Sequence, residues 1–514
     1  MHTPRRPGAC FTTPPRERRG TVFRSRLKGA CAWCAAHDQP QRIFKPGVSR
    51  QRRGTGAAAA ALLLAALYCP AFAADAPHIV CILADDLGWK DVGFNRGEPL
   101  TPNLDRLAAE GAVLRAFYAQ PYSTQTRAAL LTGRYPMRYG LQSGSILPAS
   151  RYGLPTEERT LAQALKERGY RTAFLGRWQL GHAKPEFWPT RRGFDHFYGT
   201  LSGRVDAQLR KGGKADWRRN EQPVTEAGYV TALLAKEAAS IIDKHAARAP
   251  LFLMVSFTAP ALAANPPREL LAKHASVSDE ARRNYVAATV ALDAAVGEIV
   301  AALERRKMLD GTLIVFHGDN GGGVPTRFPT ADGDGQSSAA DNGPWREGRG
   351  SLYEGGVRVP ALAHWPGRIK PGTVIGDPVH VTDVYTTAVK LAGGSLEQPR
   401  KPDGLDLWPA LAEAQRSPRK ETLLDVEDFR GAIRVGEWKL IVHAALPSRV
   451  ELFDIANDPE EAENKADTYP ERVQELLARL NSYAYDMAPS KRLEEIFGAA
   501  GQTAGFWRHN PANR

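Results

Sequence analysis

Strand-like and helix-like segments alternate along most of this chain, and that order restricts the fold more than any other feature. Short apolar runs with the length of strands are separated by segments in which apolar residues recur at helical spacing. The expected strands are residues 78–83, 170–175, 251–257 and 312–317, and the expected helices are 104–111, 126–132, 160–168, 228–245 and 284–307. This alternation predicts an α/β fold, in which helices cover both faces of a large, mixed but mostly parallel sheet.

The pattern changes toward the C-terminus. Residues 431–435 and 438–442 read as two strands joined by a short turn, which predicts a small antiparallel sheet, and residues 470–487 read as a helix. We therefore expect a main domain at residues 74–415 and a C-terminal α+β subdomain at residues 416–514.

Polar side chains follow two of the expected strands. Asp85 and Asp86 come after the first apolar run, and Asp319 and Asn320 come after the run at residues 312–317. Sites in parallel sheets lie beyond the carboxyl ends of the strands, so these four side chains are expected to meet there. Carboxylate and amide oxygens suit Ca²⁺ or Mg²⁺, whereas the simpler interpretation is that they are solvated loop residues.

A secretory signal is expected at residues 48–73. Three arginines precede an apolar run at residues 57–68, which is too short to cross a bilayer. Small residues at Ala71 and Ala73 predict cleavage before Ala74. The mature protein is therefore expected in the periplasm or secreted, without a stable membrane anchor.

The net charge of +12 comes almost entirely from residues 1–73. Residues 1–73 carry 13 Lys or Arg and two Asp or Glu, which leaves 55 basic and 54 acidic residues in the remainder. The mature chain is thus nearly neutral, and nucleic acid is not an expected partner. Residues 1–47 are rich in Pro and Arg without periodicity, and we expect a non-native or disordered extension, with Val48 as the alternative translation start.

Five motif-bearing parts of the chain occur in a recognisable order. They are residues 83–91 (LADDLGWKD), 127–136 (RAALLTGRYP), 317–322 (HGDNGG), 348–360 (GRGSLYEGGVRVP) and, near the C-terminus, 434–440 with 451–459. In this order they resemble the sulfatase family of the alkaline phosphatase superfamily, and most closely its arylsulfatase B type. The resemblance runs from about residue 77 to about residue 487 and implies a hydrolase of sulfuric esters.

The resemblance also implies a set of metal ligands. By analogy with the family, Asp85, Asp86, Asp319 and Asn320 bind the ion and Ser123 completes the coordination sphere. Calcium is the family's usual ion, and Mg²⁺ suits the same oxygen ligands.

Ser123 occupies the position at which the family oxidises Cys, or less often Ser, to formylglycine. The hydrate of formylglycine attacks sulfur in that family, so the resemblance implies a maturation enzyme as a partner. The signature Cys-x-Pro-Ser-Arg appears here as Ser-Thr-Gln-Thr-Arg, with Gln125 in place of the customary Pro or Ala. An alternative role for Ser123 is that of a helix N-cap.

Four further positions depart from the family pattern. Arg177 and Arg349 replace lysines, and Gln179 and Ala261 replace histidines. Arginine keeps the charge and can grip a tetrahedral anion with two donors, so these two residues are expected to stabilise charge together with Arg127. The lost histidines remove candidate proton donors, a role typically worth ~10²–10⁴-fold in rate. The side-chain amide of Gln179 can still form hydrogen bonds, but it does not titrate.

Three functions fit these residues. The first is an exported sulfatase, matured at Ser123, that cleaves a small-molecule or glycan sulfate ester. The second is a phosphate or phosphonate ester hydrolase that uses the unmodified Ser123 hydroxyl. The third is a non-catalytic relative that binds a sulfated glycan. His317 is either a substitute proton donor or a packing residue.

Overall fold

The computed structural model describes residues 76–97, 101–202, 208–209, 216–246, 248–261, 266–324, 339–444 and 447–498. The expected signal peptide and the extension before it lie outside these residues, so both stay predictions.

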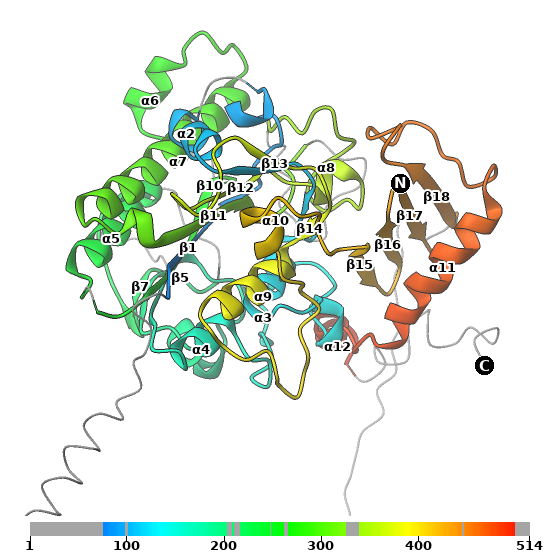
Figure 1. The fold of residues 1–514 in the computed structure, drawn as a ribbon, viewed down its shortest axis with the longest axis horizontal. Coiled ribbons are helices and arrows are strands. Elements are labelled where there is room, and N and C mark those ends of the chain that lie inside the picture. Colours follow the sequence, from blue (N-terminus) through cyan, green and yellow to red (C-terminus); the bar gives the residue numbers. More distant parts are fainter. Residues whose placement is uncertain are drawn as a thin grey trace, which may run out of the picture. The chain divides into compact units, whose positions relative to one another are not determined.

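A ten-stranded sheet forms the centre of the main domain (Figure 1). Its strands, in spatial order, are β13 (Thr373–Ile375), β2 (Ala112–Leu114), β12 (Ala361–His364), β11 (Thr312–Gly318), β1 (His78–Asp85), β10 (Leu251–Pro260), β4 (Arg171–Arg177), β5 (His196–Thr200), β7 (Arg218–Arg219) and β8 (Gln222–Pro223). The five strands from β11 to β5 are mutually parallel. Strand β12 runs antiparallel to both neighbours, so the sheet is mixed, as expected.

Alternate residues of β1 serve the two faces of this sheet. Ile79, Cys81 and Leu83 pack under the helices α3 (Ser123–Thr132), α4 (Leu161–Lys166) and α9 (Val381–Leu391). Val80 and Ile82 pack under α2 (Pro102–Ala109), α5 (Val230–Lys244) and α7 (Glu280–Arg305). A strand buried on both faces must be apolar throughout, which is why this run carries no alternation. The predicted α/β fold with helices on both faces is confirmed.

Helix α7 begins earlier than its apolar spacing predicted. Asp279 precedes it and accepts a hydrogen bond from the Arg282 amide at 2.6 Å, which caps the helix. Among the described residues, this helix alone is long and apolar enough to cross a membrane, but 67% of its apolar window is buried. Its contacts with α5, β10 and α2 make it a core helix.

The C-terminal part forms a separate antiparallel sheet, as predicted. Its strands are β15 (Glu421–Glu427), β16 (Arg430–Val435), β17 (Trp438–His443) and β18 (Arg449–Asp454), in that order. Helix α11 (Pro470–Tyr485) packs on one face through Leu476 and Leu480. The other face packs against the main domain around Tyr118 and Tyr353.

Shorter elements complete the described fold. They are the strands β3 (Phe117–Tyr118), β6 (Gln208–Leu209), β9 (Gly228–Tyr229) and β14 (Val379–His380), and the helices α6 (Arg268–Lys273), α8 (Glu354–Val357), α10 (Trp408–Ala412) and α12 (Lys491–Phe497).

Candidate active site

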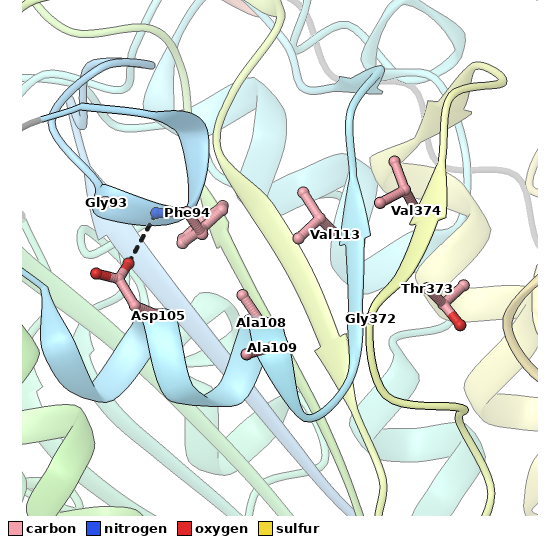
Figure 2. A pocket seen from close by; sticks show the side chains of 9 residues that line it. All are labelled: Gly93, Phe94, Asp105, Ala108, Ala109, Val113, Gly372, Thr373 and Val374. Atoms are coloured by element: carbon pink, nitrogen blue, oxygen red, sulfur yellow. Dashed lines mark hydrogen bonds between the residues drawn. The ribbon is translucent and has the colours of Figure 1, made fainter.

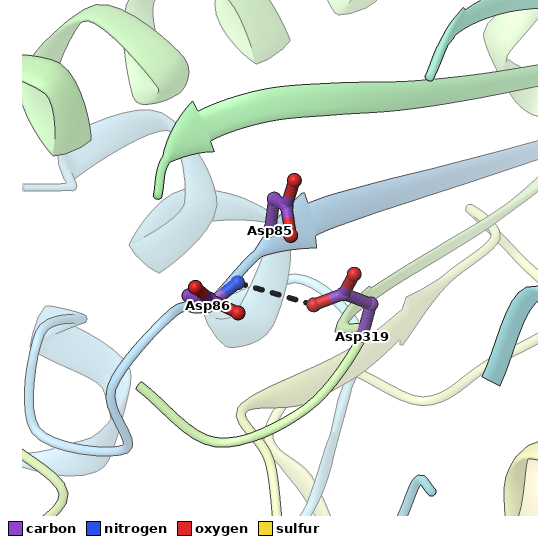
Figure 3. Close-up of side chains that lie close together, drawn as sticks. All are labelled: Asp85, Asp86 and Asp319. Carbon is purple, nitrogen blue, oxygen red and sulfur yellow. Dashed lines mark hydrogen bonds between the residues drawn. The ribbon is translucent and has the colours of Figure 1, made fainter. Parts of the chain in front are cut away.

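Three carboxylates meet at the carboxyl edge of the central strands. Asp85 ends β1 and Asp86 follows it, while Asp319 comes directly after β11. The two strands are in parallel register, with Ala84 beside Gly318, so the residues that follow are neighbours. Oxygen atoms of the three carboxylates lie within 4.8 Å of one another, and all three residues are buried (Figure 3). The Asp86 amide donates to Asp319 Oδ1 at 3.1 Å and fixes the turn.

Asn320 and Ser123 join the carboxylates from two other segments. Asn320 Nδ2 donates to Asp86 Oδ1 at 2.6 Å, which turns its amide oxygen toward Ser123. The Ser123 Oγ lies 3.1 Å from Asn320 Oδ1 and 3.3 Å from Asp85 Oδ1. The five side chains expected to surround a metal are thus brought together, and every one of them is buried.

Ser123 is the first residue of α3 and not its N-cap. Tyr122 holds the N-cap position, and its amide donates a hydrogen bond to Gln125 Oε1 at 3.2 Å. The alternative role as N-cap is therefore wrong, because Gln125 and Tyr122 cap the helix one residue earlier. The Ser123 hydroxyl is left to face Asp85 and Asn320, at the positive end of the helix.

The charges of this cluster are unevenly balanced. Burial raises the pKa of Asp85, but Arg177, Arg127 and Arg349 outweigh burial and hold that pKa below its usual value. Burial raises the pKa of Asp86, and the charge of Asp85 adds to this effect. Burial and the neighbouring carboxylates together raise the pKa of Asp319 to about 7. A divalent cation would relieve this repulsion, and the all-oxygen donor set fits Ca²⁺ or Mg²⁺.

Three arginines surround the carboxylates. Arg127 donates to Asp319 Oδ2 at 2.5 Å and to Ser256 Oγ at 3.1 Å. Arg177, at the end of β4, is bonded to Asp85, and Arg349 donates to Asp86 Oδ2 at 3.3 Å. The three predicted cationic residues therefore converge on the same cluster as Ser123.

Two of these guanidinium groups have buried N–H donors without an acceptor among the described residues. Within the described part of the chain, Arg127 Nη2 and Arg177 Nε are buried and have no hydrogen-bond partner. A buried donor without an acceptor costs about 1–3 kcal/mol, so an anion bound here would recover that cost. The arrangement therefore fits a tetrahedral oxyanion beside Ser123.

The positions of the two lost histidines also lie at this edge of the sheet. The Gln179 side chain is buried, and its Oε1 has no hydrogen-bond partner among the described residues. The Ala261 amide donates to the Asp85 carbonyl at 3.0 Å, so Ala261 directly adjoins the site. Neither residue can transfer a proton.

His317 packs in the core and does not replace these histidines. Its Nδ1 lies 2.7 Å from the Gly318 carbonyl oxygen, and its ring lies against Phe117. Burial lowers the pKa of His317 to about 4, so its imidazole is neutral near pH 7. The packing interpretation of this residue fits its surroundings.

The sequence alone did not indicate two residues that support the site. Ser256 lies in β10 and accepts from Arg127, and its only sequence signal is a hydroxyl within an apolar strand. Tyr285 of α7 donates to the Asp86 carbonyl at 3.0 Å and accepts from the Gly88 amide at 3.0 Å. Tyr285 comes from a helix about 200 positions away, so no local pattern reveals its role.

A hollow of about 320 Å³ lies elsewhere, beside α2 and β13 (Figure 2). Its walls include Phe94, Val113 and Val374. Its single carboxylate, Asp105, already accepts from the Phe94 amide at 2.8 Å and from Thr101 Oγ1 at 3.0 Å. This hollow shares no lining residue with the carboxylate cluster and offers no reactive group.

Comparisons with known proteins agree on one family. The family model described as Sulfatase matches residues 77–395, and the model described as N-sulphoglucosamine sulphohydrolase, C-terminal, matches residues 345–486. The chain is 31% identical to mouse arylsulfatase J over 80% of this chain and 76% of that protein. It is 35% identical to human arylsulfatase A, over 73% of this chain and 77% of that protein.

Solved structures give the same result. The crystal structure of Ps i-CgsB in complex with k-i-k-neocarrahexaose matches with a TM-score of 0.73 and 31% identity, over 83% of this chain and 99% of that one. The structure of PsFucS1 sulfatase from Pseudoalteromonas sp. matches with a TM-score of 0.65 and 26% identity, over 85% and 95% of the two chains.

Proposed function

This chain belongs to the sulfatase family, a family of sulfuric ester hydrolases, and we propose that it cleaves sulfate esters carried by a carbohydrate or an aryl group. The relatives named for arylsulfates and the neighbour bound to neocarrahexaose support this substrate class. The observation that carries the proposal is the convergence of Ser123, three arginines and three carboxylates in one buried cluster.

Asp85, Asp86, Asp319 and Asn320 would hold a divalent cation, with Ca²⁺ as the first choice and Mg²⁺ as the second. Their donors are all hard oxygen atoms, and their mutual repulsion supports a cation between them. Such an ion, when bound, supplies Lewis-acid polarisation of an ester oxygen.

Arg127, Arg177 and Arg349 would bind the sulfate group. Arg127 Nη2 and Arg177 Nε make no hydrogen bond to any of the described residues. They can therefore donate to sulfate oxygens without breaking an existing hydrogen bond. Charge-assisted hydrogen bonds of this kind are about twice as strong as neutral ones. Donors fixed in place before the reaction stabilise the charge that develops on the sulfuryl oxygens.

Ser123 would carry the nucleophile, after oxidation to formylglycine by a maturation enzyme. Formylglycine supplies a second hydroxyl on hydration, which a serine side chain lacks. The position suits this role because the Oγ faces Asp85 and Asn320 and the positive end of α3 favours an anion nearby. Export of the chain through residues 48–73 to the periplasm or the medium is part of the same proposal.

Proton transfer to the leaving group is the weakest part of this site. Gln179 and Ala261 stand where the family pattern has histidines, and Arg177 and Arg349 keep their protons near neutral pH. The site would therefore favour esters whose alcohol leaves readily without protonation.

The mass of the peptide that contains Ser123 tests the proposed nucleophile. The protein is purified from the periplasm of its native host, and the peptide is expected to be lighter than the encoded one by two hydrogens. A fully unmodified serine would refute the formylglycine mechanism and would leave the phosphoester hydrolase and the non-catalytic binder, which turnover of an aryl phosphate separates.

A further inference from the structure

A hairpin of the C-terminal sheet reaches the helix that carries Ser123. Strands β15 and β16 form this hairpin, and Arg430 is the first residue of β16. The Arg430 Nη1 donates to the Gly350 carbonyl at 2.5 Å, and its guanidinium carbon lies 5.8 Å from the centroid of the Tyr122 ring. One side chain thus contacts the residue before Ser123 and the residue after Arg349.

The two segments that Arg430 contacts are also joined to each other. The Gly350 amide donates to the Pro121 carbonyl at 2.9 Å. Gly350 has a φ of +83°, which strains a residue with a side chain, and a Cβ there would crowd the Tyr122 hydroxyl at 3.1 Å. The close packing means that a shift of either segment moves Ser123 and Arg349 relative to each other.

Arg430 is itself held firmly. Its Nε is bonded to Glu427, which lies three residues earlier on the same hairpin. Its side chain is 20% exposed, so most of the guanidinium group is enclosed by the hairpin, Tyr122 and Gly350. A planar guanidinium with two fixed partners defines the distance between them better than a flexible ammonium would.

A second contact from the same hairpin reaches the same helix turn. Burial raises the pKa of the Asp425 carboxyl group in β15, and the nearby side chain of Gln125, two residues after Ser123, partly offsets that rise. Gln125 also caps α3 through Tyr122, as described above. The hairpin therefore lies close to both sides of the turn that presents Ser123, and on one side it meets Gln125, a residue that departs from the family signature.

We propose that Arg430 is a positioning residue for sulfate-ester hydrolysis, which fixes Ser123 and Arg349 at their working separation. The inference rests on the proposed function, because these are the groups that would attack and bind the sulfuryl centre. The C-terminal sheet is then a part of the active-site architecture and not only a cover for the main domain. Misplacement of reacting groups by about 1 Å can cost about 100-fold in rate.

The test compares Arg430→Met with Arg479→Met, using the full-length matured protein. Arg479 lies on α11 of the same subdomain and forms a 2.9 Å ion pair with Glu421, so its loss is a matched control away from Ser123. We expect Arg430→Met to lower kcat by about 10- to 100-fold and to raise KM by no more than about tenfold. Arg479→Met should leave both constants near the wild-type values.

A second readout separates positioning from general loss of structure. The thermal midpoints and the dissociation constant for inorganic sulfate are measured for each variant. We expect Arg430→Met to bind sulfate about 3- to 10-fold more weakly, because Arg349 is displaced, in a protein that still unfolds in one cooperative transition. Equal kcat and sulfate affinity in Arg430→Met and wild type would overturn the proposal.

If Arg430→Met does not fold, Arg430→Lys is the variant that tests whether Arg430 positions Ser123 and Arg349. Lysine keeps the charge but cannot hold Glu427 and Gly350 with one planar group, so kcat should fall about threefold or more in a folded protein. A folded Arg430→Lys protein with wild-type kcat would also refute the inference. A wild-type protein that neither releases nor binds sulfate would instead refute the proposed function itself.

Discussion

Addition of a divalent cation to the metal-free protein should raise its thermal stability measurably. Asp85, Asp86 and Asp319 place oxygens within 4.8 Å of one another in a buried cluster that exists only in the folded chain. A ligand that binds only the folded state stabilises it by about 2.7 kcal/mol at 100 times its dissociation constant. Unfolding of about 400 folded residues carries an entropy of about 0.8 kcal/mol/K, so the midpoint should rise by about 3 °C.

Differential scanning calorimetry after chelation, with and without Ca²⁺ or Mg²⁺, measures this shift. Asp319→Asn should abolish most of it, because one charged ligand is lost from the centre of the cluster. Asp293→Asn is the matched control: Asp293 is buried and accepts from the Leu104 amide at 2.8 Å, so its loss should lower the midpoint but preserve the shift. An unchanged midpoint in the wild type at millimolar cation, or a full shift in Asp319→Asn, would contradict cation binding by this cluster.

Three further results are expected. Arg177→Met should weaken the binding of inorganic sulfate about tenfold or more in calorimetric titration, because one charge-assisted donor is lost; an unchanged affinity would place the anion elsewhere. Rates on a series of aryl sulfates should fall steeply as the pKa of the leaving phenol rises, since Gln179 cannot protonate it; a flat series would reveal a proton donor that the sequence does not predict. Lys439→Met should destabilise the fold by about 3–5 kcal/mol in urea titrations, because its Nζ lies 2.9 Å from Glu354 and 2.8 Å from Glu461, all buried. Burial raises the pKa of Glu461 to about 7, so ionisation of Glu461 lowers the free energy of unfolding as pH rises from about 4.5 through 7. The free energy lost in Lys439→Met should therefore be larger at pH 8, where Glu461 is charged, than at pH 5. Equal losses at the two pH values would contradict this pH dependence.

Most of the fold followed from local patterns. Strands β1 and β11 are buried on both faces, so their apolar runs were visible without any structure, and their ends located Asp85 and Asp319. Strands β15 and β18 were not predicted. Each lies at an edge of the small sheet, paired with one neighbour, and its sequence lacks a clear alternation of apolar and polar residues.

The candidate site was only partly predictable, and the reason is distance along the chain. The four strand-end residues and Ser123 could be placed by motif, and the structure brings them together. The contacts of Arg430 with Tyr122 and Gly350 join segments that are about 80 and 300 residues away, and no local pattern encodes such a pairing. The start of α3 was also misplaced, because a tyrosine N-cap supported by Gln125 is an unusual capping arrangement.

The release of inorganic sulfate shows directly whether this chain hydrolyses sulfate esters. Protein matured in its native host is incubated with an aryl sulfate and with sulfated oligosaccharides, and the Ser123→Ala variant is measured beside it. We predict sulfate release by the wild type and its loss in Ser123→Ala, with sulfate binding retained in the variant. No release by the wild type, or equal release by both proteins, would contradict sulfate-ester hydrolysis through Ser123.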